Sequence, residues 1–181
     1  MQVVHPYIEG LLVLTPRKFE DERGYFTESF NQRVFNELVG ADIRFVQDNE
    51  SVSSRHVLRG LHFQKPPHAQ GKLVRVSSGS VLDIAVDLRK DSPTFGKWHG
   101  EILSAANGKL FWIPEGFAHG FIALEDHTKF LYKCTDYYAP DSEGTLRWND
   151  PTLNIDWGNN HPIVSEKDKK GRIFEELNSP F

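Results

Sequence analysis

The sequence predicts a mainly β protein, built as an antiparallel sandwich or barrel with a few short helices. From residue 43 onward, short apolar segments follow one another, separated by turns rich in Pro, Gly, Asn and Asp, a spacing typical of such folds. The thirteen Phe, five Tyr and four Trp also favour strands. Because the chain has 181 residues and no segment typical of a linker, we expect a single domain over residues 1–181.

Each predicted element has its own pattern. A helix with apolar residues at 34, 35, 38 and 39 is expected between Asn31, which can cap it, and Gly40, which ends it. A second, short helix signal begins at Ser165 and is ended by Gly171. A turn is expected at residues 21–24. Strands are predicted at residues 3–4, 11–14, 43–47, 57–64, 72–76, 81–88, 98–103, 110–113, 120–124 and 129–135.

Composition excludes several classes of protein. The net charge of −4 argues against general nucleic-acid affinity. Cys134 is the only cysteine, so no intrachain disulfide forms and a cytoplasmic location is expected. No secretory signal opens the chain, and no apolar run approaches the roughly 20 residues of a membrane helix. We therefore expect no membrane and no nucleic-acid partner.

The segment 57–64 places polar residues on an otherwise apolar strand. Strict alternation would direct Arg59 and His62 to opposite faces. Gly60 lies between them, where a β-bulge could bring both side chains to one side. A lone histidine on such a strand is more often a satisfied core residue than part of a site, so its significance depends on its neighbours in the fold.

Residues 108–119, with the sequence GKLFWIPEGFAH, resemble the second motif of the cupin superfamily. The resemblance implies a cupin-type antiparallel β-barrel, or jelly roll, with His119 directed into it. Metal-dependent cupins also need a His-x-His pair, but Gln64 occupies the position two residues after His62. Lys72 follows nearby, and an ammonium beside a divalent ion is unfavourable. We therefore expect no metal.

Without a metal, the predicted barrel mouth has the residues for proton transfer. It contains no activated nucleophile. It does contain a candidate base, His62, a candidate acid, Tyr132, and a cation, Lys72. This set suits proton abstraction next to a carbonyl, with positive charge stabilising the enolate. The complete set expected at the mouth is His62, His119, Arg59, Lys72, Tyr132 and Tyr138.

Each of these residues also has a structural interpretation. Tyr132 alone is typical of a core tyrosine with its hydroxyl at the surface, and Lys72 alone of a solvated lysine. His119 could bond a neighbouring strand. Asp168 follows Ser165 at the spacing of a capping box.

Longer motifs resemble the dTDP-4-dehydrorhamnose 3,5-epimerase family over nearly the whole chain, from about residue 14 to residue 168. They are QDN at 47–49, LRGLHFQ at 58–64, QGKLVR at 70–75, DIAVDLR at 83–89, SPTFG at 92–96, WIPEGFAHGF at 112–121 and YKCTD at 132–136. DERGYFTE at 21–28, WNDP at 148–151 and SEKD at 165–168 fit as well. This set is far more specific than the cupin motif alone.

The resemblance implies catalytic roles. His62 resembles the base that removes the C5 and C3 protons of a 4-keto sugar, and Asp168 resembles the partner that orients its ring. Lys72 resembles the cation that stabilises the enolate at O4. Tyr132 resembles the acid that returns a proton on the opposite face of the sugar, as inversion at carbon requires.

The resemblance also implies a dTDP-sugar substrate, a homodimer that shares strands between subunits, and no metal or redox cofactor. Arg59 and His119 resemble ligands of the pyrophosphate or sugar, since arginine suits phosphate geometry. Further substrate-binding residues, some supplied by the second subunit, correspond to Arg23, Phe26, Glu28, Gln47, Asp48, Asn49, Tyr138, Glu143 and Lys167.

Several functions remain open at this point. The double epimerase of the dTDP-L-rhamnose pathway is favoured by the motif set. A 3- or 5-mono-epimerase from another deoxysugar pathway would keep the same base. A non-catalytic cupin that binds nucleotide-sugars predicts loss of the base or acid, yet His62, Lys72 and Tyr132 are all present. A metal-dependent cupin oxygenase or isomerase is disfavoured by Gln64 and Lys72.

Overall fold

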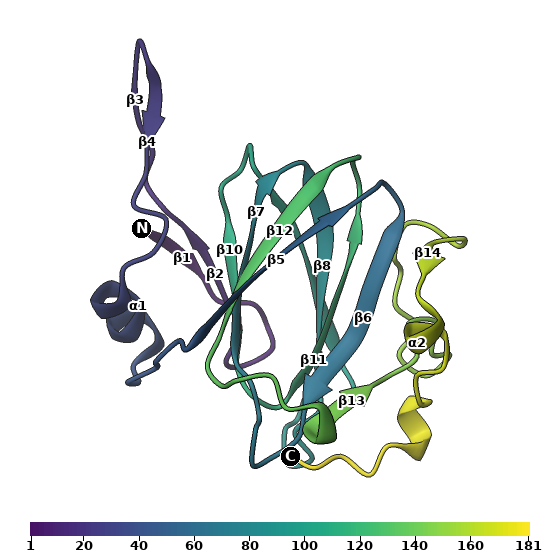
Figure 1. Ribbon diagram of the computed structural model, residues 1–181. Coiled ribbons are helices and arrows are strands. Elements are labelled where there is room, and N and C mark those ends of the chain that lie inside the picture. The colour runs from purple at the N-terminus through teal and green to yellow at the C-terminus, as the bar shows by residue number, and fades with distance from the viewer.

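The computed structural model describes residues 1–181 as two antiparallel sheets that face each other (Figure 1). The first sheet has the order β1 (Gln2–Val4), β2 (Leu12–Thr15), β10 (Leu110–Ile113), β7 (Lys72–Ser78), β12 (Thr128–Cys134) and β5 (Gln47–Ser53). The second has the order β13 (Glu143–Thr145), β6 (Val57–Gln64), β11 (Phe117–Ala123), β8 (Ser80–Asp87) and β9 (Trp98–Ser104). The mainly β, antiparallel architecture predicted from the sequence is confirmed.

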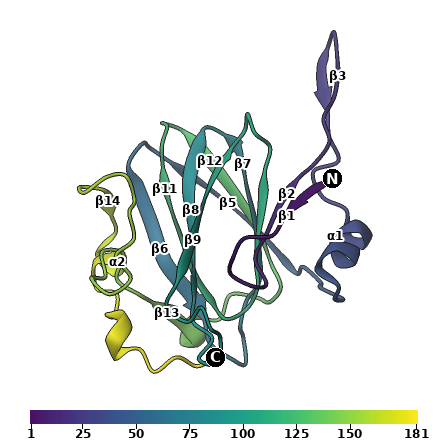
Figure 2. The ribbon, with the colours of Figure 1, turned by 180° about the vertical axis from the view of Figure 1, so that it is seen from behind.

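Smaller elements surround these sheets. The short β14 (Ile163–Val164) pairs parallel with β6. β3 (Phe19–Asp21) and β4 (Gly24–Phe26) form a separate hairpin that projects away from the sheets (Figures 1 and 2). The helices are α1 (Gln32–Val39), α2 (Glu166–Lys169) and two single 3₁₀ turns, η1 (Pro140–Ser142) and η2 (Phe174–Glu176). None of the helices is long and apolar enough to cross a membrane.

Three apolar clusters hold the layers together. The largest lies between the sheets and joins Phe111 and Phe130 of the first to Phe121 of the second. A second cluster lies on the outer face of the second sheet, which the C-terminal residues, among them Trp157, cover. The third packs Phe35 of α1 on the outer face of the first sheet. Because α1 and the C-terminal segment cover opposite outer faces, both sheets are shielded on two sides (Figures 1 and 2).

The predicted elements are largely found, with some corrections. Helix α1 has the predicted cap, since the Asn31 side chain accepts from the N–H of Val34, and Gly40 ends it with a φ of 72°. The strand predicted at residues 43–47 is wrong, because Ile43 and Phe45 pack beside α1 instead of entering a sheet. The strand begins at Gln47 and runs through polar residues to Ser53. β11 begins three residues earlier than predicted, and β13, β14 and the hairpin strands were not predicted as strands.

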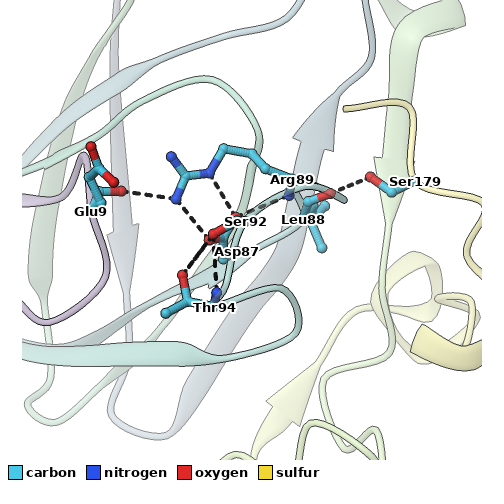
Figure 3. Close-up of polar contacts among 7 residues, drawn as sticks. All are labelled: Glu9, Asp87, Leu88, Arg89, Ser92, Thr94 and Ser179. Atoms are coloured by element: carbon cyan, nitrogen blue, oxygen red, sulfur yellow. Dashed lines mark hydrogen bonds and ion pairs between the residues drawn. The ribbon is translucent and has the colours of Figure 1, made fainter.

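A buried carboxylate closes the end of the second sheet (Figure 3). Asp87, the last residue of β8, is fully buried. It accepts hydrogen bonds from the backbone and guanidinium of Arg89 at 2.8–3.0 Å, from Ser92 Oγ at 2.6 Å and from Thr94 Oγ1 at 2.7 Å. Since all of these donors come from the loop after β8, this one side chain orders that loop.

The same loop binds two distant segments. Arg89 donates to the carbonyl of Glu9, in the connection between β1 and β2, at 2.9 Å. Ser179 of the C-terminal tail donates to the carbonyl of Leu88. The guanidinium of Arg89 also lies over the ring of Phe117 at the start of β11. The Asp87 network therefore fixes the end of the barrel at which β11 begins.

Replacing Asp87 by Asn should destabilise the fold in a pH-dependent way. Burial raises the pKa of Asp87, but hydrogen bonds from Arg89, Ser92 and Thr94 outweigh it and hold the pKa below its ordinary value. A depressed folded-state pKa adds stability above the unfolded-state value, which is lost as the pH falls through the folded-state value. We expect Asp87→Asn to lose about 1–3 kcal/mol at pH 7, and the difference from the wild type to shrink below about pH 4. Urea unfolding at several pH values measures this; a pH-independent difference would contradict it.

Candidate active site

A cavity of about 490 Å³ lies between the two sheets, beside α2. It contains five of the six residues expected at the barrel mouth, all except Tyr138. Its walls are Ser51, Val57, Leu58, Arg59, His62, Lys72, His119, Phe121, Phe130, Tyr132, Ile163, Val164, Ser165, Lys167 and Asp168. A second hollow of about 280 Å³ shares His62, Lys72 and Tyr132 with it. These three residues therefore stand where the two hollows meet.

The bulge predicted in β6 is present. His62 pairs with His119 of β11, and Arg59 pairs with Phe121, so four residues of β6 oppose three of β11. Gly60 has a φ of 129°, and a Cβ there would lie 2.5 Å from the Cα of Gly120. Because the extra residue shifts the alternation, Arg59 and His62 both line the cavity.

His62 is paired with a buried carboxylate. Its Nε2 lies 2.5 Å from Asp168 Oδ1, and Asp168 Oδ2 accepts from the N–H of Gly60 at 3.3 Å. Burial raises the pKa of Asp168, but the hydrogen bond and charge of His62 and the N–H of Gly60 lower it below its ordinary value overall. An ionised carboxylate at this distance can orient an imidazole and stabilise its protonated form. The sequence interpretation of Asp168 as part of a helix cap is also correct in part, since its N–H bonds Ser165 Oγ.

Lys72 and Tyr132 face His62 from the other sheet. Lys72 on β7 is 9% exposed and takes part in none of the ion pairs of the chain. Burial lowers the pKa of Lys72, although Cys134, Asp83 and Glu143 act in the opposite direction. Burial also raises the pKa of Tyr132, which packs against the central core, so its phenol stays protonated at neutral pH. Both residues border the cavity.

A second buried histidine–carboxylate pair lies behind the first. His119 Nε2 is 3.0 and 2.9 Å from the two oxygens of Asp83 on the neighbouring strand β8. The histidine therefore bonds an adjacent strand and also borders the cavity. Burial raises the pKa of Asp83, against the lowering effect of His119. Asp83 was missed in the sequence, where its signal is a lone carboxylate in the apolar run of residues 81–86.

Four of the nine residues expected around the nucleotide border the second, outer hollow, and a fifth, Lys167, borders the first, inner cavity. Gln47 donates to Asn49 at 2.9 Å and accepts from the N–H of Tyr138 at 3.0 Å. The Tyr138 hydroxyl donates to Glu143 at 3.2 Å, and Lys167 pairs with the same carboxylate at 2.5 Å. The five predicted residues thus form one continuous network. On the inner side, Arg59 is held on β5 by Ser53 Oγ at 3.2 Å and the Val52 carbonyl at 3.3 Å.

The structure separates four predicted residues from this cavity. Asp48 lies on the outward face of β5, pairs with Lys133 at 2.9 Å and borders neither hollow, because alternation directs it away from Gln47 and Asn49. Arg23 and Phe26 lie on the projecting hairpin and Glu28 just after it (Figures 1 and 2). Arg23 pairs with Asp21 at 2.5 Å, and Phe26 is 70% exposed.

Gln64 has a structural role of its own. Its amide donates to the carbonyls of His68 and Tyr137 at 2.7 and 3.1 Å and accepts from the N–H of Ala139 at 2.9 Å. The residue that replaces a metal-ligating histidine therefore joins the two loops at the outer hollow.

Comparison with known proteins places the chain in a family. The family model described as dTDP-4-dehydrorhamnose 3,5-epimerase matches residues 5–176. The chain belongs to the dTDP-4-dehydrorhamnose 3,5-epimerase family. The epimerase of this name from Salmonella typhimurium is 52% identical over 177 residues, which cover 97% of each chain. Members of this epimerase family are isomerases with the cupin-type jelly roll that the sequence predicted.

Two solved structures resemble the chain closely. The dTDP-6-deoxy-D-glucose-3,5-epimerase from Legionella pneumophila, in complex with dTDP-4-keto-L-rhamnose, has a TM-score of 0.94 and 47% identity, covering 98% of this chain and 94% of that one. The 3′-monoepimerase ChmJ from Streptomyces bikiniensis, in complex with dTDP-quinovose, has a TM-score of 0.88 and 34% identity, covering 94% and 87%. The epimerase fold is thus shared by enzymes that act at different carbons.

Replacing Gly60 by Ala should destabilise the fold by more than backbone strain alone explains. Gly24 has a similar φ of 122°, and a Cβ added there would have nothing within 4 Å, whereas a Cβ at residue 60 meets the β11 backbone. Gly24→Ala is expected to cost about 1–3 kcal/mol for strain, and Gly60→Ala about 1–3 kcal/mol more for the clash. Urea unfolding of both variants measures the difference. Equal losses would show that β11 does not constrain the bulge.

Proposed function

We propose that the chain converts dTDP-4-dehydro-6-deoxy-glucose to dTDP-4-dehydro-rhamnose by epimerisation at C3 and C5. One observation supports this most strongly. His62 stands on the second sheet and is paired with Asp168 of α2, while Tyr132 and Lys72 stand on the first sheet, across the same cavity. A sugar bound between the sheets has a base on one face and an acid on the other, as inversion at carbon requires.

The proposed chemistry follows from these positions. His62, oriented by Asp168, takes the proton at the carbon next to the 4-keto group. The C–H electron pair forms the enolate double bond, and the carbonyl pair moves onto O4, where the charge of Lys72 stabilises it. Lys72 has no anionic partner of its own, so the enolate supplies the missing counter-charge. Tyr132 then donates its proton to the opposite face of the carbon, and the carbonyl re-forms.

The remaining residues are proposed to bind the nucleotide-sugar. Arg59 and His119 line the inner cavity, and a guanidinium suits the pyrophosphate. The network of Gln47, Asn49, Tyr138, Glu143 and Lys167 borders the hollows on the outer side. We assign this network to the nucleotide, because Tyr138 is 54% exposed and offers a ring for stacking against a base.

We further propose a homodimer in which the hairpin of one subunit completes the site of the other. The hairpin exposes Phe19, Tyr25 and Phe26 by 50%, 57% and 70%, an apolar surface typical of an interface. Arg23 lies on this hairpin and Glu28 just after it. Both residues are expected at the nucleotide, yet both lie away from the cavity of their own chain. A homodimer fits both observations, because the partner subunit then covers the apolar surface and supplies these two side chains to the site.

The likeness to ChmJ keeps mono-epimerisation as a second candidate. Both reactions need the same base, so the cavity walls do not separate them. Counting the carbons that exchange protons with solvent distinguishes the two reactions.

The first experiment follows the substrate by proton NMR in deuterated water. Wild-type enzyme is expected to introduce deuterium at both C3 and C5; deuterium at one carbon would mean a mono-epimerase. His62→Ala should slow exchange at both carbons by about 10³-fold. Tyr132→Phe should slow product formation by about 10²-fold while sparing C5 exchange, since His62 still removes that proton. Wild-type-like turnover in His62→Ala would exclude it as the base.

The shared site can be tested by mixing two variants. His62→Ala lacks the base, and Arg23→Ala lacks a hairpin cation; each alone should be nearly inactive. If the hairpin serves the partner, co-refolded mixed dimers contain one intact site, so roughly a quarter of all sites should recover activity. Activity no higher than the sum of the separate variants would mean that the hairpin does not act across subunits.

A further inference from the structure

The carboxylate that contacts His62 lies on a helix too short to hold its own position. α2 has four residues, Glu166–Lys169, and Asp168 is the third. A helix of this length gains little stability from its own hydrogen bonds. The direction of the Asp168 carboxylate, whose side chain is only 4% exposed, therefore depends on what fixes the ends of this segment.

Ser165 caps α2 at its N-terminal end. Its Oγ accepts a hydrogen bond from the backbone N–H of Asp168 at 3.1 Å. In a full capping box, the acidic side chain at this position would reach back to the backbone N–H of the serine. Here the carboxylate contacts His62 at 2.5 Å and Gly60 N–H at 3.3 Å instead. Ser165 thus holds the main chain of Asp168 while its side chain is directed at β6.

Contacts on both sides of α2 bind this segment to strands next to His62. β14 pairs with β6 directly before Ser165. After the helix, the N–H of Arg172 donates to the carbonyl of Thr145 at 3.0 Å, and Thr145 is the register partner of His62. Gly171 lies against Leu146, where a Cβ would come within 2.5 Å of the backbone. Since both flanks are anchored, the turn that Ser165 closes decides where Asp168 points.

We propose that Ser165 is a positioning residue, whose hydroxyl directs the Asp168 carboxylate toward His62 and so orients the imidazole. This inference rests on the proposed function, in which His62 is the base. Without the Oγ, the N–H of Asp168 loses its acceptor, and the free N–H groups of the first turn compete for the carboxylate. The contact between Asp168 and His62 then loosens, although both side chains are still present.

A second capped helix provides a matched control. Asn31 caps α1 in the same manner, with its Oδ1 accepting from the N–H of Val34 at 3.2 Å. α1 packs on the outer face of the first sheet, on the other side of the molecule from α2 (Figures 1 and 2). Loss of either cap weakens its helix. Only loss of the Ser165 cap is expected to change the chemical step.

The test measures kcat and KM for the 4-keto substrate at a temperature where every variant is folded. Ser165→Ala should lower kcat about tenfold with KM nearly unchanged, because a small displacement of catalytic groups costs rate more than binding. Ser165→Thr, which keeps a capping hydroxyl, should stay within about threefold of the wild-type kcat. Asn31→Ala should match the wild-type kcat. Asp168→Asn, which removes the carboxylate charge, should lose more activity than Ser165→Ala.

The outcomes separate this inference from the proposed function. If Asp168→Asn is impaired but Ser165→Ala behaves like Asn31→Ala, the positioning role is overturned and the base assignment stands. An equal loss of kcat in Ser165→Thr and Ser165→Ala also overturns it, because the hydroxyl would then be irrelevant. A wild-type kcat in Asp168→Asn overturns the histidine–carboxylate pair itself, and with it the proposed mechanism.

Discussion

The contact between β6 and β11 at Gly60 is the constraint on which the site depends. The absence of a side chain lets the β11 backbone approach, with Gly120 facing Gly60. The extra residue in β6 brings Arg59 and His62 to the same cavity. The N–H of Gly60 also donates to Asp168. Gly60 therefore affects the pairing of β6 with β11, the direction of the His62 side chain and the position of its partner, Asp168.

The two sheets then divide the chemistry between them. On the second sheet, His62 contacts the Asp168 carboxylate of α2, whose pKa lies below its ordinary value. The first sheet supplies the amine of Lys72, whose pKa burial lowers, and the phenol of Tyr132, whose pKa burial raises. A buried charge without a counter-ion costs free energy, which is why burial lowers the pKa of Lys72. In the proposed mechanism, the enolate that develops beside Lys72 offsets part of that cost. The separation of the sheets keeps the proposed base and the proposed acid apart.

Several elements were predictable because their signals are local. Helix α1 follows from the cap at Asn31, the glycine at its end and the apolar positions between them. β6 and β10 have the predicted bounds because their apolar runs end at turn residues. β5 was misplaced for a physical reason. Ile43 and Phe45 alternate like a strand but pack beside a helix, whereas the true strand presents polar residues to the cavity and to solvent, leaving no hydrophobic period to detect.

The sequence alone determined the antiparallel β class of the protein and, by resemblance, predicted candidate residues for proton transfer. Tertiary structure decided which of these residues meet. His62 and Asp168 are 106 positions apart, and His119 and Asp83 are 36 apart. Strand pairing and sheet packing bring them together, and no local pattern encodes those long-range contacts. For the same reason, the outward position of Asp48, the burial of Lys72 and the separation of the hairpin from its own cavity are visible only in the folded chain.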